Sequence, residues 1–357
     1  MRRPPERRVR LTDVARLAGT SEATASRALK DDRRIGEATR DAVRAAAHKL
    51  GYVPNAAARS LRAKRTHILG LLLDDLADPV HGKVAAGFEE AAASRGYAVF
   101  MMTGLHDAER EQRALRAFVE HRADGIVLAS CISDPSDVFR SVPQDRVVFV
   151  QPDYPALADG AEPPSHGVLR TDDVGGFTLA VEHLVGQGYR RIGYVGPGVG
   201  SSDALRRAAA SEALDRLGFG PMRFVDSGPN GWRDPFVAAQ QLAADPPDGV
   251  VCYDDKLALA LLDALRSTRL DVPRDLALVG FDGIPPARQS RPRLTTVDVP
   301  SVQIGQHAVE MLVSSIRDGI PVPSETVPVR LVVGESTPPA NVARDPSPVG
   351  ARQAGDR

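Results

Sequence analysis

A short run near the N-terminus carries side chains that are suited to reading the edges of DNA bases. Glu22, Ala23 and Arg27 fall in the first turns of residues 22–29, which have the pattern of a short helix. An arginine can donate two hydrogen bonds to guanine O6 and N7, a glutamate can accept one from cytosine N4, and an alanine can only touch a thymine methyl group. For Glu22 the positive end of the helix dipole is an equal explanation, and for Arg27 a surface ion pair is the alternative. Three hydroxyl groups in the same run are sized for phosphate contacts, which position a protein without specifying sequence; they belong to Ser21, Thr24 and Ser26.

The charge of the chain is divided between its two ends. Residues 1–65 contain 17 Lys and Arg against 7 Asp and Glu, a net charge of +10, so the formal net charge of −1 for all 357 residues conceals a strongly acidic remainder. A confined basic segment is typical of a module that meets a polyanion. A solvated basic face would carry the same charge, and the pattern inside the segment has to decide between the two.

The elements that must position these side chains are two short helices joined by a glycine turn. Residues 12–18 are predicted to form the first helix, with Thr12 as its N-cap. Its apolar face comprises Val14, Leu17 and Ala18, at helical spacing. Gly19 can supply a turn with positive φ, and Ser21 is a natural N-cap for the second helix.

A third amphipathic helix completes the unit over about residues 37–50, and it ends at Gly51, which suits a helix C-terminus. The inward faces are predicted to be Ala25, Ala28 and Leu29 in the second helix and Val43, Ala46, Ala47 and Leu50 in the third. Two short helices around a glycine turn form a helix-turn-helix. We therefore expect a small all-α DNA-binding domain over residues 11–53, preceded by a basic arm over residues 1–10.

The remainder of the chain alternates apolar strands with amphipathic helical stretches. Nine strands are predicted, in HILGLLLDD, YAVFMMTG, DGIVLAS, RVVFVQ, HGVLRTD, RIGYVGPG, MRFVDSG, DGVVCYDD and LALVGFDG. Buried strands that alternate with helices imply parallel sheets with right-handed crossovers. We expect a two-lobed α/β core with one such sheet in each lobe.

Composition and short motifs exclude several other classes of protein. No apolar run approaches the roughly 20 residues that cross a bilayer, and the basic start lacks the apolar stretch of a secretory signal. Cys131 and Cys252 lie in apolar runs, which favours buried reduced thiols over a disulfide. No CxxC or HExxH pattern indicates zinc. We expect a cytoplasmic protein with no cofactor, no metal and no membrane partner.

The order of residues resembles the LacI/GalR family of bacterial transcriptional regulators. The head resembles it over LTDVARLAGTSEATASRALK and EATRDAVRAAAHKLGYVPNAAARSLRAKRTHILGLLL, and the core over DGIVLAS, VEHLVGQGYRRIGYVG, DALRRAAASEALDRLG, DVPRDLALVGFDG and RLTTVDVPSVQIGQHAVEML. The resemblance covers about residues 11–338, with Thr20 and Gly36 standing where the family usually has Val and Ser. It implies a homodimeric repressor that binds near-palindromic double-stranded operator DNA. It also implies control by a small-molecule effector, which we expect to be a sugar, bound between the lobes of a periplasmic-binding-protein-like core.

Residues 54–65 follow the head with a helix-favouring pattern. Proline is tolerated in the first turn of a helix, and three alanines favour continuation. The resemblance implies a hinge helix that orders on DNA, with Leu61 entering the minor groove at the centre of the site. We include Asn55 among its DNA contacts. From its residue type alone, Leu61 would more often be a core residue.

The candidate effector contacts are residues that follow strands, because small molecules bind open parallel sheets beside the carboxyl ends of their strands. The resemblance aligns Arg206 with an arginine that contacts sugar effectors, with Arg207 as the neighbouring alternative, and it matches Asp282 to an effector-contacting aspartate. Asp254 stands where the family commonly has Asn. Charged groups make strong hydrogen bonds to hydroxyls. Each carboxylate could instead cap the N-terminus of a helix.

Three further side chains complete the candidate effector site: His81, Ser130 and Trp232. Trp232 is the only tryptophan and could stack on a sugar face or pack against the protein. His81 stands where the family often supplies an aromatic residue, and it could instead be a surface or capping histidine. Gln151 follows the fourth predicted strand where an acidic residue is common, so the identity of the effector stays open.

The division into lobes follows from the same resemblance. We expect lobe 1 to comprise about residues 66–166 and 296–322, lobe 2 about residues 167–295 and 323–340, and a disordered tail to follow from residue 341. Two other classes stay open: a solute-binding protein, and a nucleotide-dependent enzyme. The enzyme has one indication, the glycine-rich run of residues 196–200, but a dinucleotide fingerprint would need glycine where Ser201 stands.

Overall fold

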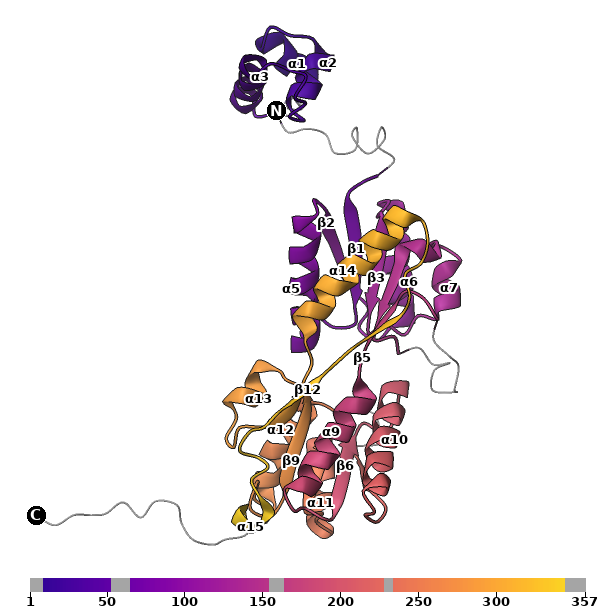
Figure 1. Ribbon diagram of the computed structural model, residues 1–357, viewed down its shortest axis with the longest axis vertical. Helices are drawn as coiled ribbons and strands as arrows, with labels where there is room; N and C mark the ends of the chain where they lie inside the picture. Colours follow the sequence, from indigo (N-terminus) through magenta and orange to yellow (C-terminus); the bar gives the residue numbers. More distant parts are fainter. Residues whose placement is uncertain (1–8, 53–64, 154–163, 228–233, 344–357) are drawn as a thin grey trace, which may run out of the picture. The chain divides into compact units, whose positions relative to one another are not determined.

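The computed structural model describes residues 9–52, 65–153, 164–227 and 234–343 of the chain. They belong to two compact units, divided after Thr66 (Figure 1). The first unit is a helical head, and the second is a core of two lobes. The hinge helix predicted over residues 54–65 lies outside the described residues except for residue 65. The disordered tail predicted from residue 341 also lies outside them, except for residues 341–343, where the prediction is wrong because these residues belong to the short helix α15 (Ala340–Ala343).

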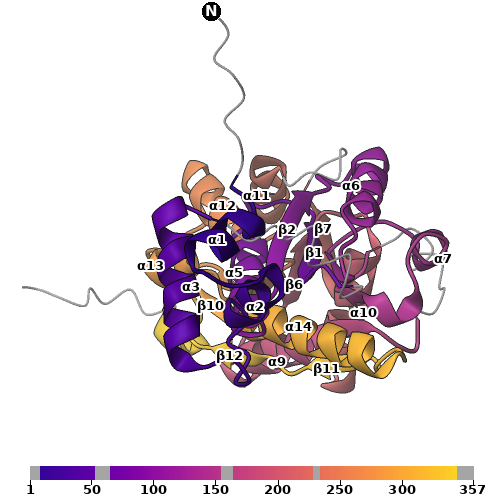
Figure 2. The same ribbon diagram turned by 90° about the horizontal axis from the view of Figure 1, so that it is seen from above.

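The head is a bundle of three helices (Figure 2), namely α1 (Leu11–Leu17), α2 (Glu22–Ala28) and α3 (Glu37–Leu50). As predicted, Ser21 is the N-cap of α2, because its hydroxyl accepts a hydrogen bond of 3.1 Å from the backbone N–H of Thr24. Gly19 and Gly51 have φ of +63° and +62°, a left-handed conformation that glycine adopts without steric cost. The side chains buried between the helices are small: Val14, Ala15, Ala25, Ala28, Val43, Ala46 and Ala47.

Two predictions for α1 are wrong. Its N-cap is Arg10 and not Thr12, because the carboxylate of Asp13 accepts the backbone N–H of Arg10 at 2.9 Å and the helix therefore begins earlier. Leu17 was predicted to face inward, but it is 47% exposed. α1 packs against both other helices of the head, so its buried stripe is centred on Val14 and Ala15 instead.

Lobe 1 is built on a six-stranded sheet in the order β11-β5-β4-β3-β1-β2, with all neighbouring strands parallel. Its strands are β1 (Ile68–Leu73), β2 (Ala98–Thr103), β3 (Gly125–Ala129), β4 (Val147–Val150), β5 (Val168–Thr171) and β11 (Glu325–Val327). Its helices are α5 (Pro79–Ser94), α6 (Ala108–Glu120), α7 (Pro135–Phe139), the 3₁₀ turn η1 (Gln144–Arg146) and α14 (Ser301–Asp318). α5 and α14 lie side by side (Figures 1 and 2). Their backbones can approach closely because Gly87 has no side chain. A Cβ at this position would lie only 2.0 Å from the carbonyl oxygen of Val302.

Lobe 2 has a second six-stranded sheet, in the order β12-β10-β9-β8-β6-β7, in which only the pair β10 and β12 is antiparallel. Its strands are β6 (Ile192–Gly196), β7 (Arg223–Asp226), β8 (Gly249–Cys252), β9 (Ala277–Asp282), β10 (Thr295–Asp298) and β12 (Arg330–Val332). Its helices are α9 (Asp173–Gly186), α10 (Ser201–Arg216), α11 (Pro235–Ala244), α12 (Asp255–Ala264), the 3₁₀ turn η2 (Leu265–Ser267), α13 (Pro285–Gln289) and α15 (Ala340–Ala343).

All nine predicted strands are confirmed, and the predicted parallel sheets with them. The strands that sequence reasoning missed are β10, β11 and β12, which have four residues or fewer. Neither β11 nor β12 has a fully buried residue. They therefore lack the continuous apolar run by which buried strands are recognised.

The predicted boundaries between the lobes are wrong at all three crossings. Lobe 2 was expected to begin at residue 167, but β5 pairs with β4 and completes the sheet of lobe 1. Lobe 1 was expected to resume at residue 296, but β10 pairs with β9 in lobe 2. Lobe 2 was expected to hold residues 323–340, but β11 pairs with β5. At each crossing the chain first completes one more strand in the lobe that it is leaving: β5 in lobe 1, β10 in lobe 2 and β11 in lobe 1.

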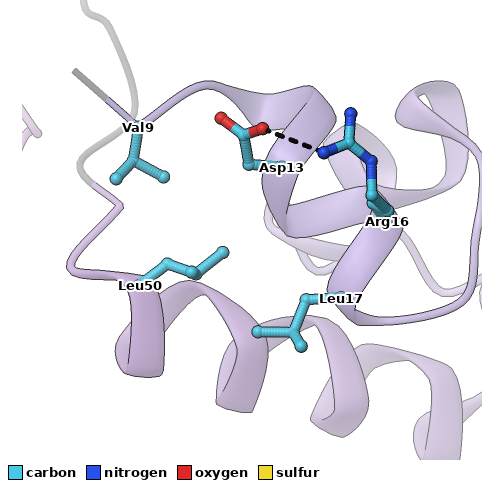
Figure 3. A pocket seen from close by; sticks show the side chains of 5 residues that line it. All are labelled: Val9, Asp13, Arg16, Leu17 and Leu50. Atoms are coloured by element: carbon cyan, nitrogen blue, oxygen red, sulfur yellow. Dashed lines mark ion pairs between the residues drawn. The ribbon is translucent and has the colours of Figure 1, made fainter. Parts of the chain in front are cut away.

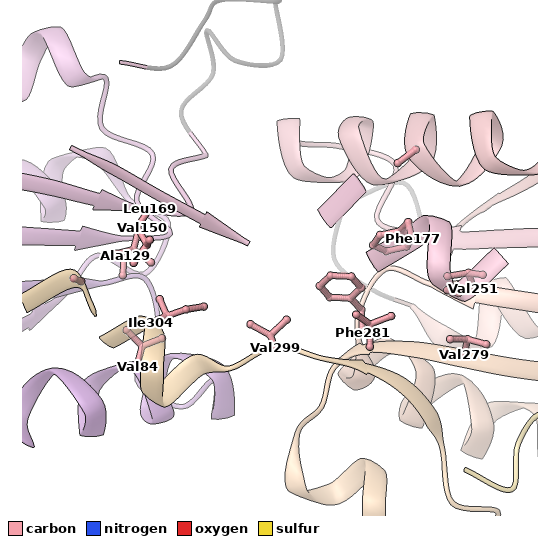
Figure 4. Close-up of a cluster of buried hydrophobic side chains, with 14 of the residues drawn as sticks. Val84, Ala129, Val150, Leu169, Phe177, Val251, Val279, Phe281, Val299 and Ile304 are labelled. Carbon is pink, nitrogen blue, oxygen red and sulfur yellow. The ribbon is translucent and has the colours of Figure 1, made fainter. Parts of the chain in front are cut away.

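One apolar cluster continues from lobe 1 into lobe 2, as the side chains in Figure 4 show. Leu169 and Ile304 belong to its lobe 1 part, Phe177 and Phe281 to its lobe 2 part, and Val299 lies between them. The rings of Phe177 and Phe281 stack with centroids 4.9 Å apart. Among the helices in the described residues, none combines the length and the apolar character that a membrane span requires.

Candidate DNA-reading face and interlobe site

The outer face of α2 presents the predicted base-reading side chains to solvent. Glu22, Ala23 and Arg27 are exposed, whereas Ala25 and Ala28 on the opposite face are buried in the head. Because buried and exposed positions alternate at helical spacing, the core of the head fixes which side chains can reach a ligand. α2 therefore has the geometry of a recognition helix in a helix-turn-helix.

The side chain of Arg27 is available for an external contact. No hydrogen bond or ion pair of its guanidinium occurs within the described part of the head. The surface ion pair, which was the alternative, is therefore not favoured. Ser21 and Thr24 bond to each other at 2.9 Å, so their hydroxyls also help to start the helix. Ser26 is half-buried.

The turn after α2 holds a second arginine that the sequence reasoning missed. Arg34 Nε and Nη2 donate to Asp32 Oδ1 and Oδ2 at 2.9 and 2.7 Å, which is a two-pronged pair. These hydrogen bonds from Arg34 lower the pKa of Asp32 to about 2. The backbone N–H of Asp32 also bonds to the carbonyl of Arg27, which ties the turn to the end of α2. Of the predicted DNA contacts, Asn55 and Leu61 lie outside the described residues.

A surface hollow of about 460 Å³ lies on the head (Figure 3). It is lined by Val9, Asp13, Arg16, Leu17 and Leu50. Asp13 and Arg16 form an ion pair of 3.6 Å at its edge. None of the predicted base-reading residues lines this hollow, and we assign it no part in DNA recognition.

In the core, the residues that follow strands of both lobes are joined by contacts from lobe to lobe. Asp153, after β4 of lobe 1, accepts hydrogen bonds from the backbone N–H groups of Ser201 and Ser202 at 3.2 and 3.4 Å and from the Ser201 hydroxyl. These N–H groups begin α10 of lobe 2, and the first N–H groups of a helix have no partner within the helix. The carboxyl ends of the two sheets therefore meet, and we call the residues gathered there the interlobe site.

Arg206 is the central cation of the interlobe site. It is 7% exposed, its Nε donates to Asp173 Oδ2 at 2.9 Å, and its Nη1 donates to the carbonyl of Tyr253 at 2.8 Å. Its guanidinium lies 4.4 Å from the ring centroid of Tyr253 and 4.6 Å from that of Phe281. Nη2 forms no hydrogen bond within the described residues, so one edge of the guanidinium is available to a ligand.

A chain of polar contacts connects Arg206 with lobe 1. The amide of Gln151, at the end of β4, donates from Nε2 to the Thr171 hydroxyl at 2.6 Å, and that hydroxyl donates to Asp173 Oδ1 at 2.5 Å. Sequence reasoning missed Asp173 and Thr171. The signal that could have found them is the pair Asp172 and Asp173 at the end of the predicted strand HGVLRTD, a strand end like those of the other candidates.

Asp282 contributes a second group to the same place. It ends β9 with φ of +106°, a conformation that is unusual for a residue with a side chain. Burial raises the pKa of its carboxyl well above the ordinary range, and the neighbouring carboxylates of Asp254 and Asp255 act in the same direction, against the opposing charge of Arg206. No hydrogen bond of its carboxylate occurs within the described residues.

The acidic pair that follows β8 is used by the protein itself. Asp254 caps α12, because its Oδ1 accepts the backbone N–H of Leu257 at 2.8 Å. This is the helix-capping role that was given above as the alternative to an effector contact. Asp255 is fully buried and accepts the backbone N–H of Ile284 at 2.9 Å and the hydroxyl of Thr296 at 2.6 Å. Burial raises the pKa of Asp255 to about 7. The hydrogen bond from Ile284 to Asp255 holds the loop that follows Asp282 in place.

The remaining candidates lie in different surroundings. His81 Nδ1 lies 2.8 Å from the carbonyl oxygen of Asp75, which is the capping role given above as the alternative. Ser130 directly follows β3 with φ of +55°, and its backbone N–H donates to the carbonyl of Val150. Arg207 pairs with Asp203 and Asp226 beside β7, away from Arg206 and its partners. Trp232 lies outside the described residues.

No metal site is indicated, since no group of three or more His, Cys, Asp or Glu side chains in the described part of the chain is arranged to hold an ion. Cys131 and Cys252 are buried free thiols, and burial raises the pKa of each well above its usual range. The glycine-rich run before α10 places the carboxylate of Asp153 at the start of the helix, where a dinucleotide fingerprint would place a phosphate.

The helical head with an exposed recognition face and the two-lobed core with polar strand ends define a class: DNA-binding regulators with a small-molecule receptor. The family described as "Bacterial regulatory proteins, lacI family" matches residues 10–55, and the family described as "Periplasmic binding protein-like domain" matches residues 181–337. The chain belongs to the lacI family of bacterial regulatory proteins.

Two curated relatives and one solved structure show the extent of the likeness. The chain is 32% identical over 321 residues to the HTH-type transcriptional regulator GalR of Escherichia coli strain K12, which covers 88% of this chain and 91% of the relative. It is 31% identical over 312 residues to the ribose operon repressor of the same strain, covering 86% and 92%. The Lac repressor dimer bound to operator and the anti-inducer ONPF has a TM-score of 0.80 at 25% identity, covering 93% of this chain and all of that one. By name, these relatives are one regulator of transcription and two repressors.

Proposed function

We propose that two copies of this chain bind a near-palindromic operator and repress transcription until a small molecule binds the interlobe site. The exposed row of Glu22, Ala23 and Arg27 on a helix whose other face is buried supports DNA reading. Two-fold symmetry of a dimer places two such helices in successive major grooves. The Lac repressor structure, a dimer on operator DNA, supports the same arrangement.

The effector that we propose is a sugar. Arg206 offers Nη2 as a donor and Asp282 offers a carboxyl group without a partner in the described residues, and this combination suits neighbouring hydroxyl groups. The rings of Tyr253 and Phe281 fix the guanidinium plane, so the donor is oriented before a ligand arrives. The ribose operon repressor, a relative by name tied to a sugar, supports this class of ligand.

The observation that carries the proposal is the exposure of Arg27 without an internal partner. The test begins with selection of duplexes from a random library by the full-length chain. Mobility shifts on the selected duplex at moderate salt follow. We expect a near-palindromic consensus whose complex weakens when the correct sugar from a panel is added. Failure to enrich any duplex would refute DNA reading.

The variant Asp282→Ala separates the two sites. It should bind the selected duplex as the parent does and lose the response to the sugar, because it removes an effector contact and leaves the head unchanged. Retention of the full response would remove Asp282 from the effector site. As an enzyme or an exported solute-binding protein, the chain would select no duplex at all.

A further inference from the structure

Two lysines, one in each lobe, reach to the opposite lobe at the interlobe site. Lys83 of α5 in lobe 1 donates a hydrogen bond of 3.0 Å to the carbonyl of Gly283, directly after Asp282 in lobe 2. Lys256 of α12 in lobe 2 donates in the other direction, to Oδ2 of Asp78 in lobe 1. Lys256 therefore makes an ionic contact from lobe to lobe, whereas Lys83 donates its hydrogen bond to a neutral carbonyl group.

Lys256 also lies close to a carboxylate of its own lobe. Its Nζ is 3.9 Å from Oδ2 of Asp254, so one ammonium group lies between two carboxylates, one from each lobe. The side chains of Asp78 and Asp254 are only 14% and 4% exposed, and that of Lys256 is 36% exposed. Water compensates two such carboxylates poorly, so the charge of Lys256 is a neutralising group close to both.

Both carboxylates are fixed before the lysine meets them, because each caps a helix. Asp78 Oδ1 accepts the backbone N–H of Val80 at 2.9 Å at the start of α5, and Asp254 Oδ1 accepts that of Leu257 at 2.8 Å at the start of α12. In each carboxylate the other oxygen faces Lys256. A bridge between two fixed groups loses less side-chain entropy than a bridge between two mobile ones.

The charge balance at the site depends on this lysine. Burial alone would raise the pKa of Asp78, but the hydrogen bond and the charge of Lys256 lower it below the ordinary range. Asp282 is close enough for its carboxyl to be affected by Asp78 and Asp254. Without the ammonium group, carboxylates of both lobes would repel one another as the lobes approach.

We propose that Lys256 is a positioning residue of the interlobe site, whose ammonium group bridges Asp78 and Asp254 and so holds the two lobes together. The inference rests on the proposed function in one respect, namely that an effector binds between the lobes. The bridge itself is a property of the core. It assigns to this chain a fixed cation between the lobes, next to the strand end that carries Asp282.

The test measures lobe contact at a place that Lys256 does not touch. The backbone N–H groups of Ser201 and Ser202 begin α10, and their bonds to Asp153 cross between the lobes. Their exchange with deuterated solvent, followed by mass spectrometry on the full-length chain, should be at least several-fold faster in Lys256→Met than in the parent. Lys256→Arg should restore the parental rate, because it keeps the charge. Addition of 1 M NaCl should accelerate the parent and leave Lys256→Met unchanged.

Asp78→Asn supplies an independent arm that keeps the helix cap, since asparagine caps as well as aspartate, and removes the charge. It should match Lys256→Met, and the double variant should exchange no faster than either single one. Arg266→Met is the matched control, because Arg266 pairs only within lobe 2, with Asp263 at 3.8 Å, among the ion pairs of the described residues.

The outcomes separate the bridge from the proposed function. Parental exchange at Ser201 and Ser202 in Lys256→Met, or additive effects of Lys256→Met and Asp78→Asn, would overturn the bridge. Failure of the parent chain to select a duplex would refute the proposed function and would leave the exchange result intact. Circular dichroism of each variant checks that faster exchange is confined to the site and is not unfolding.

Discussion

Replacing Arg206 by methionine tests whether the central cation of the interlobe site also stabilises lobe 2. Methionine keeps an unbranched apolar side chain between the rings of Tyr253 and Phe281 and removes the charge. Asp173, whose side chain is 5% exposed, then loses the ion pair of 2.9 Å and keeps the hydroxyl of Thr171 as a donor. A buried carboxylate is left without its countercharge.

The magnitude follows from that burial. Removing one partner of a buried ion pair costs about 3–5 kcal/mol of folding free energy, because the remaining charge is left uncompensated. For a domain of this size each kcal/mol lowers the melting temperature by about 2–4 °C, so the core of Arg206→Met should melt about 6–20 °C below the parent. Asp173→Asn added to Arg206→Met should recover part of the loss, because the uncompensated charge is gone.

Differential scanning calorimetry of the full-length variants at pH 7 measures these shifts. Arg191→Met is the control, since Arg191 pairs with Asp245 at 2.5 Å with both side chains about 60% exposed, and such a pair contributes at most about 1 kcal/mol. A melting temperature of Arg206→Met within about 2 °C of the parent would refute the reasoning, because the buried charge of Asp173 would then be stabilised without the charge of Arg206.

Three further outcomes are expected. Arg27→Ala should weaken binding to the selected duplex by about 1–3 kcal/mol and relax the preference at one base pair; a mobility-shift series over single-base variants that shows the parental preference would contradict this. Gly36→Ser should stabilise the head by about 0.5–1 kcal/mol, because serine adds a capping oxygen and restricts the unfolded chain. Gly36 is the N-cap of α3, with φ of −58° and open space where a Cβ would lie. Thermal unfolding followed by circular dichroism measures the change, and a lower stability would count against the prediction. Asp255, with a folded pKa of about 7 above that of an unfolded carboxyl group, keeps its proton in the folded state where the unfolded state has lost it, so its contribution to stability falls as pH rises from about 4 to about 7. Between pH 5 and pH 7 the parent should therefore lose about 2 kcal/mol of stability relative to Asp255→Asn. Urea unfolding at the two pH values measures this loss, and equal changes in the parent and the variant would exclude the assignment.

The elements that sequence reasoning predicted are those with a complete local signal. The helix over residues 37–50 has a continuous apolar stripe and a terminal glycine, and its bounds agree with α3. β1 and β8 are unbroken apolar runs because both of their faces are buried. β11 has neither signal, since its partner β5 lies more than 150 residues earlier in the chain, and pairing at that separation leaves no local pattern.

The interlobe site shows the same limit at the level of single side chains. Arg206, Asp254 and Asp282 were predicted because each follows a strand or matches the family. The partner of Arg206 was not found, because a carboxylate 33 positions away becomes a partner only through the packing of α9 against α10. Lys256 gave no signal at all, since a lysine on a helix is normally a solvated one.

The contacts between the lobes determine how large an effector response the protein can have. A ligand shifts two arrangements only by the difference in its affinity for them, and a change from 1:99 to 99:1 requires about 5.5 kcal/mol. Among the described residues, polar side-chain contacts cross at the interlobe site from Asp153, Lys83, Lys256 and Thr171, and a hydrogen bond to a charged group contributes about 1.5–3 kcal/mol. Their sum is comparable with the required difference. Loss of one of them should therefore displace the effector concentration at which the operator is released, and should not abolish the response.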